Sequence, residues 1–369
     1  MNKWVSTFLS NRLVFRPFEF TDAQSIYDNW GKITDVSKYV TWWYHASIED
    51  TFNYVSKVIN RYNDNDYMEW LICLRDTGEP IGAICIQKIN GNWEVGYNFA
   101  KSQWHKGYAT EALFRVLDFA FMHMRLSCVY SSHLEENKGS GYVMKKCGMT
   151  YVETKPITAK NIETTLLVYK INRFDWLTTC AKSKVPKLFL DGYTLRPIMA
   201  SDIDSMCKYF GDSDVVRYLY KDTRTSKVGI KNKVSELLIR CIEENFYYWV
   251  IVDDNDIPIG NIALCIDSSI HAHVSYVLSK DKWGMGIMPV MLNTVINYAF
   301  TNYPDMWVVE GSCALPNKAS SKVMEKCGMI CHGSYKCGEH QMVNCVSGKY
   351  PLVRYQITRV DWRKINYET

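Results

Sequence analysis

The chain has 369 residues, of which 47% are hydrophobic and 22% charged, and its net charge at pH 7 is +4. This composition is typical of a soluble globular protein with a sizeable core, its length fits two domains, and the weak positive charge argues against nucleic-acid binding. No apolar stretch approaches the roughly 18 residues of a transmembrane helix, and the N-terminal segment lacks the apolar centre of a signal peptide, so we expect a cytoplasmic protein without membrane contact.

Hydrophobic periodicity and turn residues predict the elements of the first half. Asp76-Thr77-Gly78 marks a turn between two strands, and Leu113, Val116 and Ala120 lie on one face of a long helix. Strands are predicted at residues 12–17, 69–74, 80–87, 93–100, 126–131, 150–152 and 165–171, and helices at 22–30, 47–61, 107–124 and 140–147. This order predicts an α/β fold, a mixed sheet with helices on both faces.

The second half of the chain repeats the first. Residues 137–149 read NKGSGYVMKKCGM, and residues 317–329 read NKASSKVMEKCGM. A period of about 180 residues is far too long for a solenoid repeat, so the chain is a tandem duplication. We predict an N-terminal domain over residues 1–177 and a C-terminal domain over residues 188–369, with a linker at Lys182–Lys187 and the arrangement of an intramolecular pseudo-dimer.

The thirteen cysteines are scattered through apolar segments, which favours reduced structural thiols over a disulfide framework. One denser cluster leaves zinc as an alternative: Cys327, Cys331, His332, Cys337, His340 and Cys345. The cluster has no Cys-x-x-Cys pair, and Cys327 has a counterpart in Cys147 within the repeated motif. We therefore expect no metal.

A loop suited to an anion precedes the long helix of the first half. Residues 104–111 read WHKGYATE and join a predicted strand to this helix. A helix N-terminus offers unpaired backbone N–H groups and the positive end of the helix dipole, and Gly107 and Ala109 would let a pyrophosphate approach the backbone. Taken alone, this loop would equally suit a plain turn before a helix.

Together with the motif at residues 137–149, the loop resembles the [Gln/Arg]-x-x-Gly-x-[Gly/Ala] acyl-CoA signature of the GNAT acetyltransferase superfamily, with Trp104 in its first position. Arg12-Leu13-x-x-Arg16-Pro17 and Glu94-Val95-Gly96-Tyr97 resemble the RimJ/RimL branch of that superfamily. The resemblance covers nearly the whole chain, once in each half. It implies two tandem GNAT domains, with acetyl-CoA as the acyl donor and the α-amino group of a ribosomal or other protein N-terminus as the acceptor.

The resemblance also implies where acetyl-CoA binds. The residues that match are Tyr97, Asn98, Phe99, Trp104, His105, Lys106, Gly107, Tyr108, Ala109, Thr110, Asn137 and Lys138. Gly96, in the middle of a strand, suits a bulge or the close approach of a ligand, and such a bulge would turn the N–H groups of Asn98 or Phe99 toward the acetyl carbonyl.

Two catalytic residues follow from the same resemblance. Glu94 is placed as the general base, acting through water on the attacking amine. Many members of the superfamily protonate the leaving thiolate with a tyrosine seven residues after the Asn, where this chain has Met144, so Ser140 inherits that role. Spacing alone would also fit a solvated glutamate and a helix-capping serine.

An aromatic segment, Trp42-Trp43-Tyr44-His45, lies where the family builds the acceptor wall. The side chains of Trp42, Trp43 and Tyr44 are candidates for binding a cationic amine through cation–π contacts. The alternative interpretation is that these aromatic side chains belong to the core.

The second half departs from the signature. Met288 stands where the first half has Ala109, Met285 replaces the cation of Lys106, and His273 replaces Glu94. We therefore expect a degraded CoA loop and sequence drift in the second half, although a histidine could also act as a base near neutral pH. The competing functions are acetylation of a small amine, such as an antibiotic or a polyamine, and non-catalytic sensing of acyl-CoA.

Overall fold

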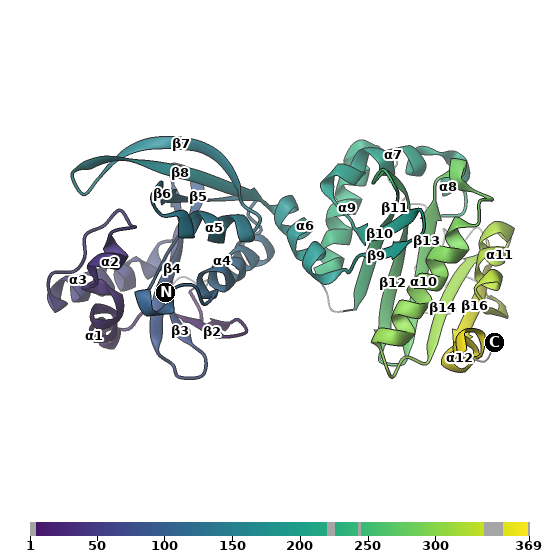
Figure 1. The fold of residues 1–369 in the computed structure, drawn as a ribbon, viewed down its shortest axis with the longest axis horizontal. Helices are drawn as coiled ribbons and strands as arrows, with labels where there is room; N and C mark the ends of the chain where they lie inside the picture. The colour runs from purple at the N-terminus through teal and green to yellow at the C-terminus, as the bar shows by residue number, and fades with distance from the viewer. Residues whose placement is uncertain (1–4, 220–225, 243–244, 336–349, 368–369) are drawn as a thin grey trace. The chain divides into compact units, whose positions relative to one another are not determined.

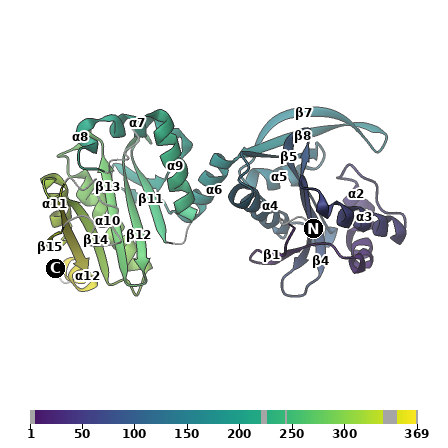
Figure 2. The same ribbon diagram turned by 180° about the vertical axis from the view of Figure 1, so that it is seen from behind.

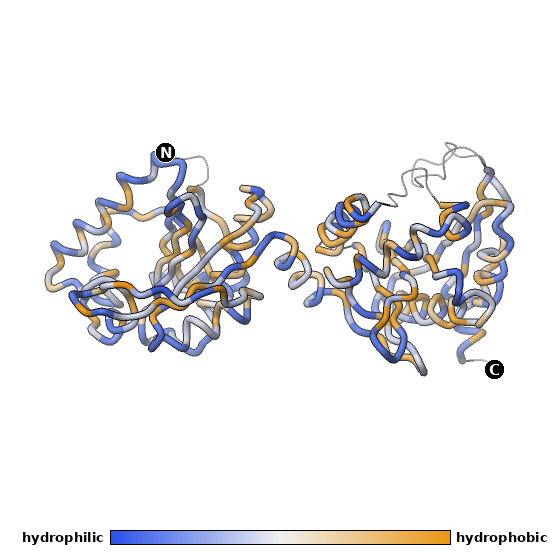
Figure 3. Tube along the Cα trace, turned by 90° about the horizontal axis from the view of Figure 1, so that it is seen from above, coloured by the Kyte–Doolittle hydropathy of each residue, from blue (hydrophilic) through white to orange (hydrophobic). Residues whose placement is uncertain are grey.

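A computed structural model describes residues 5–219, 226–242, 245–335 and 350–367. The chain separates into two compact units, Met1–Trp176 and Leu177–Thr369, called unit 1 and unit 2 below. Each unit contains one sheet of eight strands, so the prediction of two tandem α/β domains is confirmed. Apolar residues are spread through both units (Figure 3), which fits a separate core in each.

The sheet of unit 1 has the strand order β1-β2-β3-β4-β5-β6-β8-β7 (Figure 1). Neighbouring strands are antiparallel except β5 and β6, which are parallel. The strands are β1 Phe8–Leu9, β2 Leu13–Arg16, β3 Tyr67–Leu74, β4 Pro80–Ile89, β5 Asn92–Phe99, β6 Cys128–Leu134, β7 Thr150–Ala159 and β8 Ile162–Asn172.

Helices cover both faces of this sheet, as predicted: α1, α2 and α3 lie on one side and α4 and α5 on the other (Figure 1). Their bounds are α1 Ala23–Ile26, α2 Thr34–Ser37, α3 Ile48–Asn60, α4 Tyr108–Asp118, α5 Lys138–Lys146 and α6 Arg173–Lys184. The predicted linker at Lys182–Lys187 is wrong in its first half, because α6 continues through Lys184.

Local sequence signals explain where the helices begin. Ser47 and Asp50 form a capping box at the start of α3, each side chain bonding the backbone N–H of the other. Asn137 caps α5 by accepting a hydrogen bond from the N–H of Ser140. Gly107 precedes α4 with φ of +82°, a left-handed conformation that glycine adopts at little cost.

The two parallel strands of unit 1, β5 and β6, are paired at a single position. Glu94 on β5 is in register with Tyr130 on β6, and one residue further the Ser131 hydroxyl donates to the Val95 carbonyl at 2.8 Å. The expected bulge at Gly96 is wrong with respect to β4, since β4 and β5 stay in register along their whole length. Cys85 lies opposite Gly96, and its Sγ would be 3.4 Å from an added Cβ, so the ladder needs no bulge there.

The β7–β8 hairpin is longer than predicted and arches toward α2 and α3 (Figures 1 and 2). At its tip the Lys160 ammonium donates to the carbonyl of Ser37 and lies 6.0 Å from the ring centre of Trp43. The hairpin therefore reaches the helical side of unit 1 that also carries the aromatic segment.

Unit 2 repeats this topology, with the order β15-β16-β14-β13-β12-β11-β10-β9. Its strands are β9 Leu188–Leu190, β10 Tyr193–Pro197, β11 Phe246–Asp253, β12 Pro258–Ser268, β13 His271–Leu278, β14 Val308–Ala314, β15 Ile330–Tyr335 and β16 Leu352–Thr358. Its helices are α7 Ile203–Gly211, α8 Ser213–Val216, α9 Lys227–Ile242, α10 Ile287–Asn302, α11 Lys318–Lys326 and α12 Arg359–Tyr367. Among the described helices, none is long and apolar enough to span a membrane.

Candidate active site

A cleft of about 560 Å³ opens in unit 1 where β5 and β6 separate. Its walls combine aromatic rings with a small number of polar groups, the usual character of a small-molecule site. Of the predicted site residues, the following line it: Trp42, Trp43, Glu94, Tyr97, Asn98, Asn137 and Ser140. The structure thus brings both predicted catalytic residues to one cleft.

Glu94 points to the face of the sheet that carries α3. Its carboxylate is half-buried, and the resulting loss of hydration raises its pKa above that of a free glutamate. The nearby Lys155 ammonium, on β7, opposes this shift without cancelling it. A carboxylate with a raised pKa accepts a proton more readily, as a general base requires.

Ser140 is paired with a tyrosine across the gap where β5 and β6 separate. The Tyr97 hydroxyl lies 2.8 Å from Ser140 Oγ and 3.2 Å from the Ser140 carbonyl oxygen. Burial keeps Tyr97 protonated by raising its pKa far above the ordinary range for tyrosine. Tyr97 can therefore donate to Ser140 while the Ser140 hydroxyl donates to a group in the cleft.

Two asparagines also line this part of the cleft. The Asn137 amide donates to the carbonyl of Tyr39 at 3.0 Å while its oxygen caps α5, so both ends of this side chain hold structure. The Asn98 side-chain oxygen is buried and has no hydrogen-bond partner in the described structure. It is an acceptor available to a ligand donor.

The predicted pyrophosphate loop has the backbone geometry of an anion site. His105 and Gly107 both have positive φ, +63° and +82°, and the first turn of α4 follows directly. Arg12 braces the loop by donating to the Lys106 carbonyl at 3.0 Å and pairing with Glu111 at 2.7 Å. Free N–H groups, the helix dipole and a glycine without a side chain fit a pyrophosphate group.

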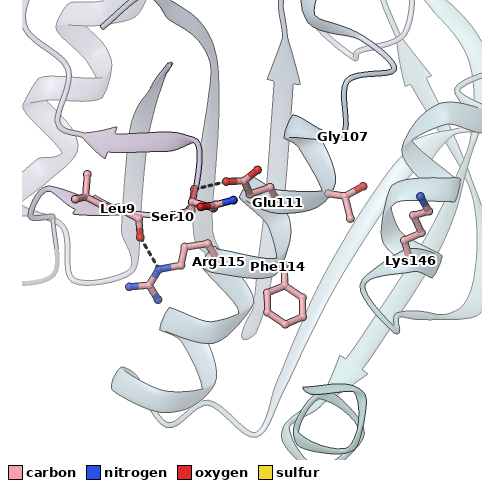
Figure 4. Close-up of a pocket in the computed structure, with 9 residues that line it drawn as sticks. Leu9, Ser10, Gly107, Glu111, Phe114, Arg115 and Lys146 are labelled. Atoms are coloured by element: carbon pink, nitrogen blue, oxygen red, sulfur yellow. Dashed lines mark hydrogen bonds between the residues drawn. The ribbon is translucent and has the colours of Figure 1, made fainter. Parts of the chain in front are cut away.

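A groove of about 600 Å³ adjoins this loop on the outer flank of α4 (Figure 4). Glu111, Phe114 and Arg115 of α4 line it, and Lys146 of α5 stands on its far side (Figure 4). Arg115 donates to the carbonyl of Leu9, which holds the N-terminal segment against the helix.

The aromatic segment divides between the cleft and solvent. Trp42 and Trp43 line the cleft, whereas Tyr44 is exposed and does not. The alternative assignment of these side chains to the core fails for Trp43, which is 58% exposed. Two further predicted residues lie away from the cleft: Phe99 is buried, and Lys138 opens α5.

Sequence reasoning missed a buried carboxylate in the same cleft. Glu69 on β3 accepts hydrogen bonds from the hydroxyls of Tyr54, at 2.6 Å, and of Tyr67. Glu69 and Tyr54 line the cleft, whereas Tyr67 does not. Desolvation raises the pKa of Glu69 despite these donors. One signal was present in the sequence, since Glu69 is the only charged residue in the otherwise apolar strand YMEWLICL.

Unit 2 keeps part of this arrangement. Tyr276 and Ser320 repeat the hydroxyl pair at 2.9 Å, and Gly284 and Gly286 repeat the two positive-φ positions of the loop. Met288 is buried, so its side chain lies in the interior of the unit. His273, in place of Glu94, is half-buried, and desolvation lowers its pKa.

The cysteine and histidine cluster gives no metal centre in the described part of unit 2. Cys337, His340 and Cys345 lie outside the described residues. Elsewhere in the described ranges, no group of three or more His, Cys, Asp or Glu side chains is placed to hold a metal ion.

Comparison with known proteins identifies the family. The family model described as "Acetyltransferase (GNAT) domain" matches residues 12–150 and again residues 193–330, more than half of the chain. The uncharacterized N-acetyltransferase YnaD of Bacillus subtilis (strain 168) is 34% identical over 143 residues, 38% of this chain and 80% of the relative. A second relative from that organism, the uncharacterized N-acetyltransferase YoaA, is 25% identical over 142 residues, again 38% of this chain and 80% of the relative.

Among solved structures, an acetyltransferase of the GNAT family from Bacillus anthracis is 28% identical, with a TM-score of 0.41, and the match covers 45% of this chain and 98% of that one. GNAT acetyltransferases use acetyl-CoA as the acyl donor. The double match of the family model agrees with the internal repeat and with the two sheets of equal topology. The chain therefore belongs to the GNAT acetyltransferase family and is an N-acetyltransferase built as a tandem duplication.

Proposed function

We propose that unit 1 transfers the acetyl group of acetyl-CoA to a primary amine, with Glu94 as the general base and Ser140 assisting the departing thiolate. The main support for this proposal is that Glu94 and the Tyr97–Ser140 pair line one cleft where β5 and β6 separate. The anion loop around Gly107 begins a few residues beyond the end of β5, where it can hold the pyrophosphate of the donor.

The proposed chemistry is a direct transfer. Glu94 takes a proton from the ammonium acceptor, directly or through one water molecule, and the neutral amine forms a C–N bond with the thioester carbonyl carbon. The C–S bond then breaks, the attacking nitrogen loses its second proton to become an amide, and the leaving sulfur takes up this proton while it accepts a hydrogen bond from the Ser140 hydroxyl. Tyr97 supports Ser140 by donating to its Oγ, which leaves the Ser140 hydroxyl hydrogen available to the leaving sulfur.

Two classes of acceptor are compatible with a primary amine. The resemblance to the RimJ/RimL branch favours a peptide α-amino group, which needs little help to lose its proton because its pKa is about 8. The lining of the cleft favours a small cationic amine: it includes Glu69 and Glu94 and several aromatic rings, but no Lys or Arg among the described residues. This second observation is developed in the next section.

Glu94→Gln tests the proposal. We expect turnover, followed by thiol release, to fall at least about 100-fold, a typical contribution of a general base. Calorimetric affinity for acetyl-CoA should stay within about twofold, since Glu94 lies apart from the anion loop. An unchanged turnover would remove Glu94 from the mechanism, and a parallel loss of acetyl-CoA binding would point to misfolding instead.

A further inference from the structure

Glu69 and Glu94 lie on the same face of the sheet and in the same cleft. Glu69 is in register with Cys85, and Cys85 with Gly96, so these three residues form a row across β3, β4 and β5. Glu94 is two residues from Gly96 on β5 and therefore shares its face. Two strand steps of about 3.4 Å and two inter-strand steps of about 4.8 Å place the Cα atoms of the two glutamates on the order of 12 Å apart.

The sheet surface between the two carboxylates is made of Gly96, Cys85 and Gln87, and Gln87 is in register with Glu94. Gly96 has no side chain, and a Cβ added there would meet only the sulfur of Cys85, at 3.4 Å. Cys85 also lines the cleft, and Trp30 and Trp42 are among the aromatic residues around it. The path from Glu94 to Glu69 thus has room for an extended aliphatic chain, with rings that suit methylene groups and cations alike.

Glu69 lacks a cationic partner. The described residues give it no ion pair, and each of its oxygens accepts one hydrogen bond from a tyrosine. Arg61, which acts on Glu69 only through its charge, stacks on the Tyr67 ring, 3.6 Å from its centre, and pairs with Asp64 at 3.3 Å. A carboxylate oxygen has two acceptor positions, so each oxygen of Glu69 retains one, and a buried carboxylate is stabilised by an ammonium that fills it.

We propose that Glu69 determines substrate specificity by binding the second ammonium group of a linear aliphatic diamine, whose first amine is acetylated beside Glu94. This inference rests on the proposed function of unit 1. With each nitrogen about 2.8 Å from a carboxylate oxygen, a chain of roughly five methylene groups spans the remaining distance. The substrate class is therefore an aliphatic diamine or a polyamine with a comparable spacing.

Unit 2 lacks both carboxylates at the equivalent positions. His273 stands in place of Glu94, and Tyr248 stands in place of Glu69, with a buried hydroxyl that has no partner in the described structure. The same fold therefore tolerates an uncharged residue at the position of Glu69, so the sheet does not need a carboxylate there to form.

The test compares 1,5-diaminopentane with n-pentylamine, which has the same carbon chain and one amine. With the full-length protein and acetyl-CoA, we expect kcat/KM for the diamine to exceed that for pentylamine at least tenfold. Glu69→Gln should lower kcat/KM for the diamine at least tenfold, mainly through KM, and leave pentylamine within twofold. Glu79→Gln, in the exposed turn before β4, is the matched control and should change neither substrate.

Glu69→Asp adds a measurement that a purely structural role would not affect. It retracts the carboxylate by one methylene, so we expect the preference to move from 1,5-diaminopentane toward 1,6-diaminohexane. Equal use of pentylamine and the diamine by the wild type would overturn the inference, as would an equal loss of both substrates in Glu69→Gln. Acetylation of these amines at a rate that Glu94→Gln leaves unchanged would instead overturn the proposed function.

Discussion

At the residue scale, an equivalent contact between a strand and a helix occurs within each unit, and different pairs of residues make it. In unit 1, His133 on β6 packs against Gly141 on α5, and a Cβ added to Gly141 would lie 2.6 Å from His133 Nε2. In unit 2 the equivalent residues are Cys313 and Ser321, whose side chains lie 3.5 Å apart. A large ring with a glycine in one unit corresponds to a small thiol with a serine in the other.

This exchange predicts strong coupling between the two positions. Gly141→Ser alone should destabilise the protein by about 1–3 kcal/mol, because the new side chain overlaps a buried ring. His133→Cys alone leaves a cavity and should also destabilise. The free energy of unfolding of the double variant should be at least about 1 kcal/mol higher than the summed effects of the two single variants predict. Urea unfolding of all four proteins in a double-mutant cycle measures this difference. Additive effects would show that the ring and the helix relax independently.

The environment of Glu94 predicts the pH dependence of turnover. The base must be ionised, and desolvation raises its pKa above that of a free glutamate, about 4.3. Activity should therefore fall as the pH drops through this raised pKa. The decrease of kcat/KM on the acid side should occur at a higher pH than for an enzyme whose base is an exposed carboxylate. Lys155 favours the ionised form, so Lys155→Met should move this decrease to higher pH; a shift to lower pH would contradict the assignment.

The residues of the cleft differ in how far the sequence could predict them. Glu94 and Ser140 could be proposed from the sequence because they belong to motifs contiguous in sequence, and the structure places both in the lining of the cleft. The network around Glu69 was missed because its members, Tyr54 and Tyr67, come from α3 and β3 and meet only through packing. A single charge in an apolar strand indicates a special environment, but the sequence does not show which hydroxyls satisfy it.

At the element scale, periodicity predicted most strands and helices of unit 1, but it missed β1 and α6 as well as the irregular features. The helix predicted over residues 107–124 becomes π-helical at Phe119–His123, and the short helix α2 was not predicted. The long β7–β8 hairpin was underestimated because most of β7 is exposed and has no apolar alternation. These features depend on tertiary contacts, such as the one between Lys160 and Ser37, that periodicity does not record.

The loop before α4 allows a controlled test of acetyl-CoA binding. Gly107→Ala forces an alanine into the left-handed region, at a cost of about 1–2 kcal/mol, and adds a Cβ at the anion site. Gly78→Ala, in the turn between β3 and β4, has the same backbone strain at φ of +71° and no neighbour within 4 Å. We expect only Gly107→Ala to weaken acetyl-CoA binding in calorimetry, at least tenfold. Equal affinities for both variants would place the donor elsewhere.

At the scale of the whole molecule, duplication has produced two units that retain the fold and differ in their chemistry. Both keep the hydroxyl pair, the helix-capping asparagine and the two positive-φ positions of the loop, which are features that also hold the structure together. The carboxylates that would perform the chemistry occur only in the first. Side chains on one face of a strand can change without altering the hydrogen bonds between the strands, so the fold can persist where the functional site is lost.

This difference predicts that a single unit is responsible for turnover. His273→Ala in unit 2 should leave kcat and KM within twofold, because we attribute turnover to unit 1 and unit 2 has no carboxylate at the position of Glu94. Glu94→Gln in the same full-length chain should remove nearly all turnover, since unit 2 has no carboxylate at that position to replace it. A residual rate of about half that of the wild type in Glu94→Gln, abolished by adding His273→Ala, would instead show that unit 2 is a second, histidine-dependent enzyme.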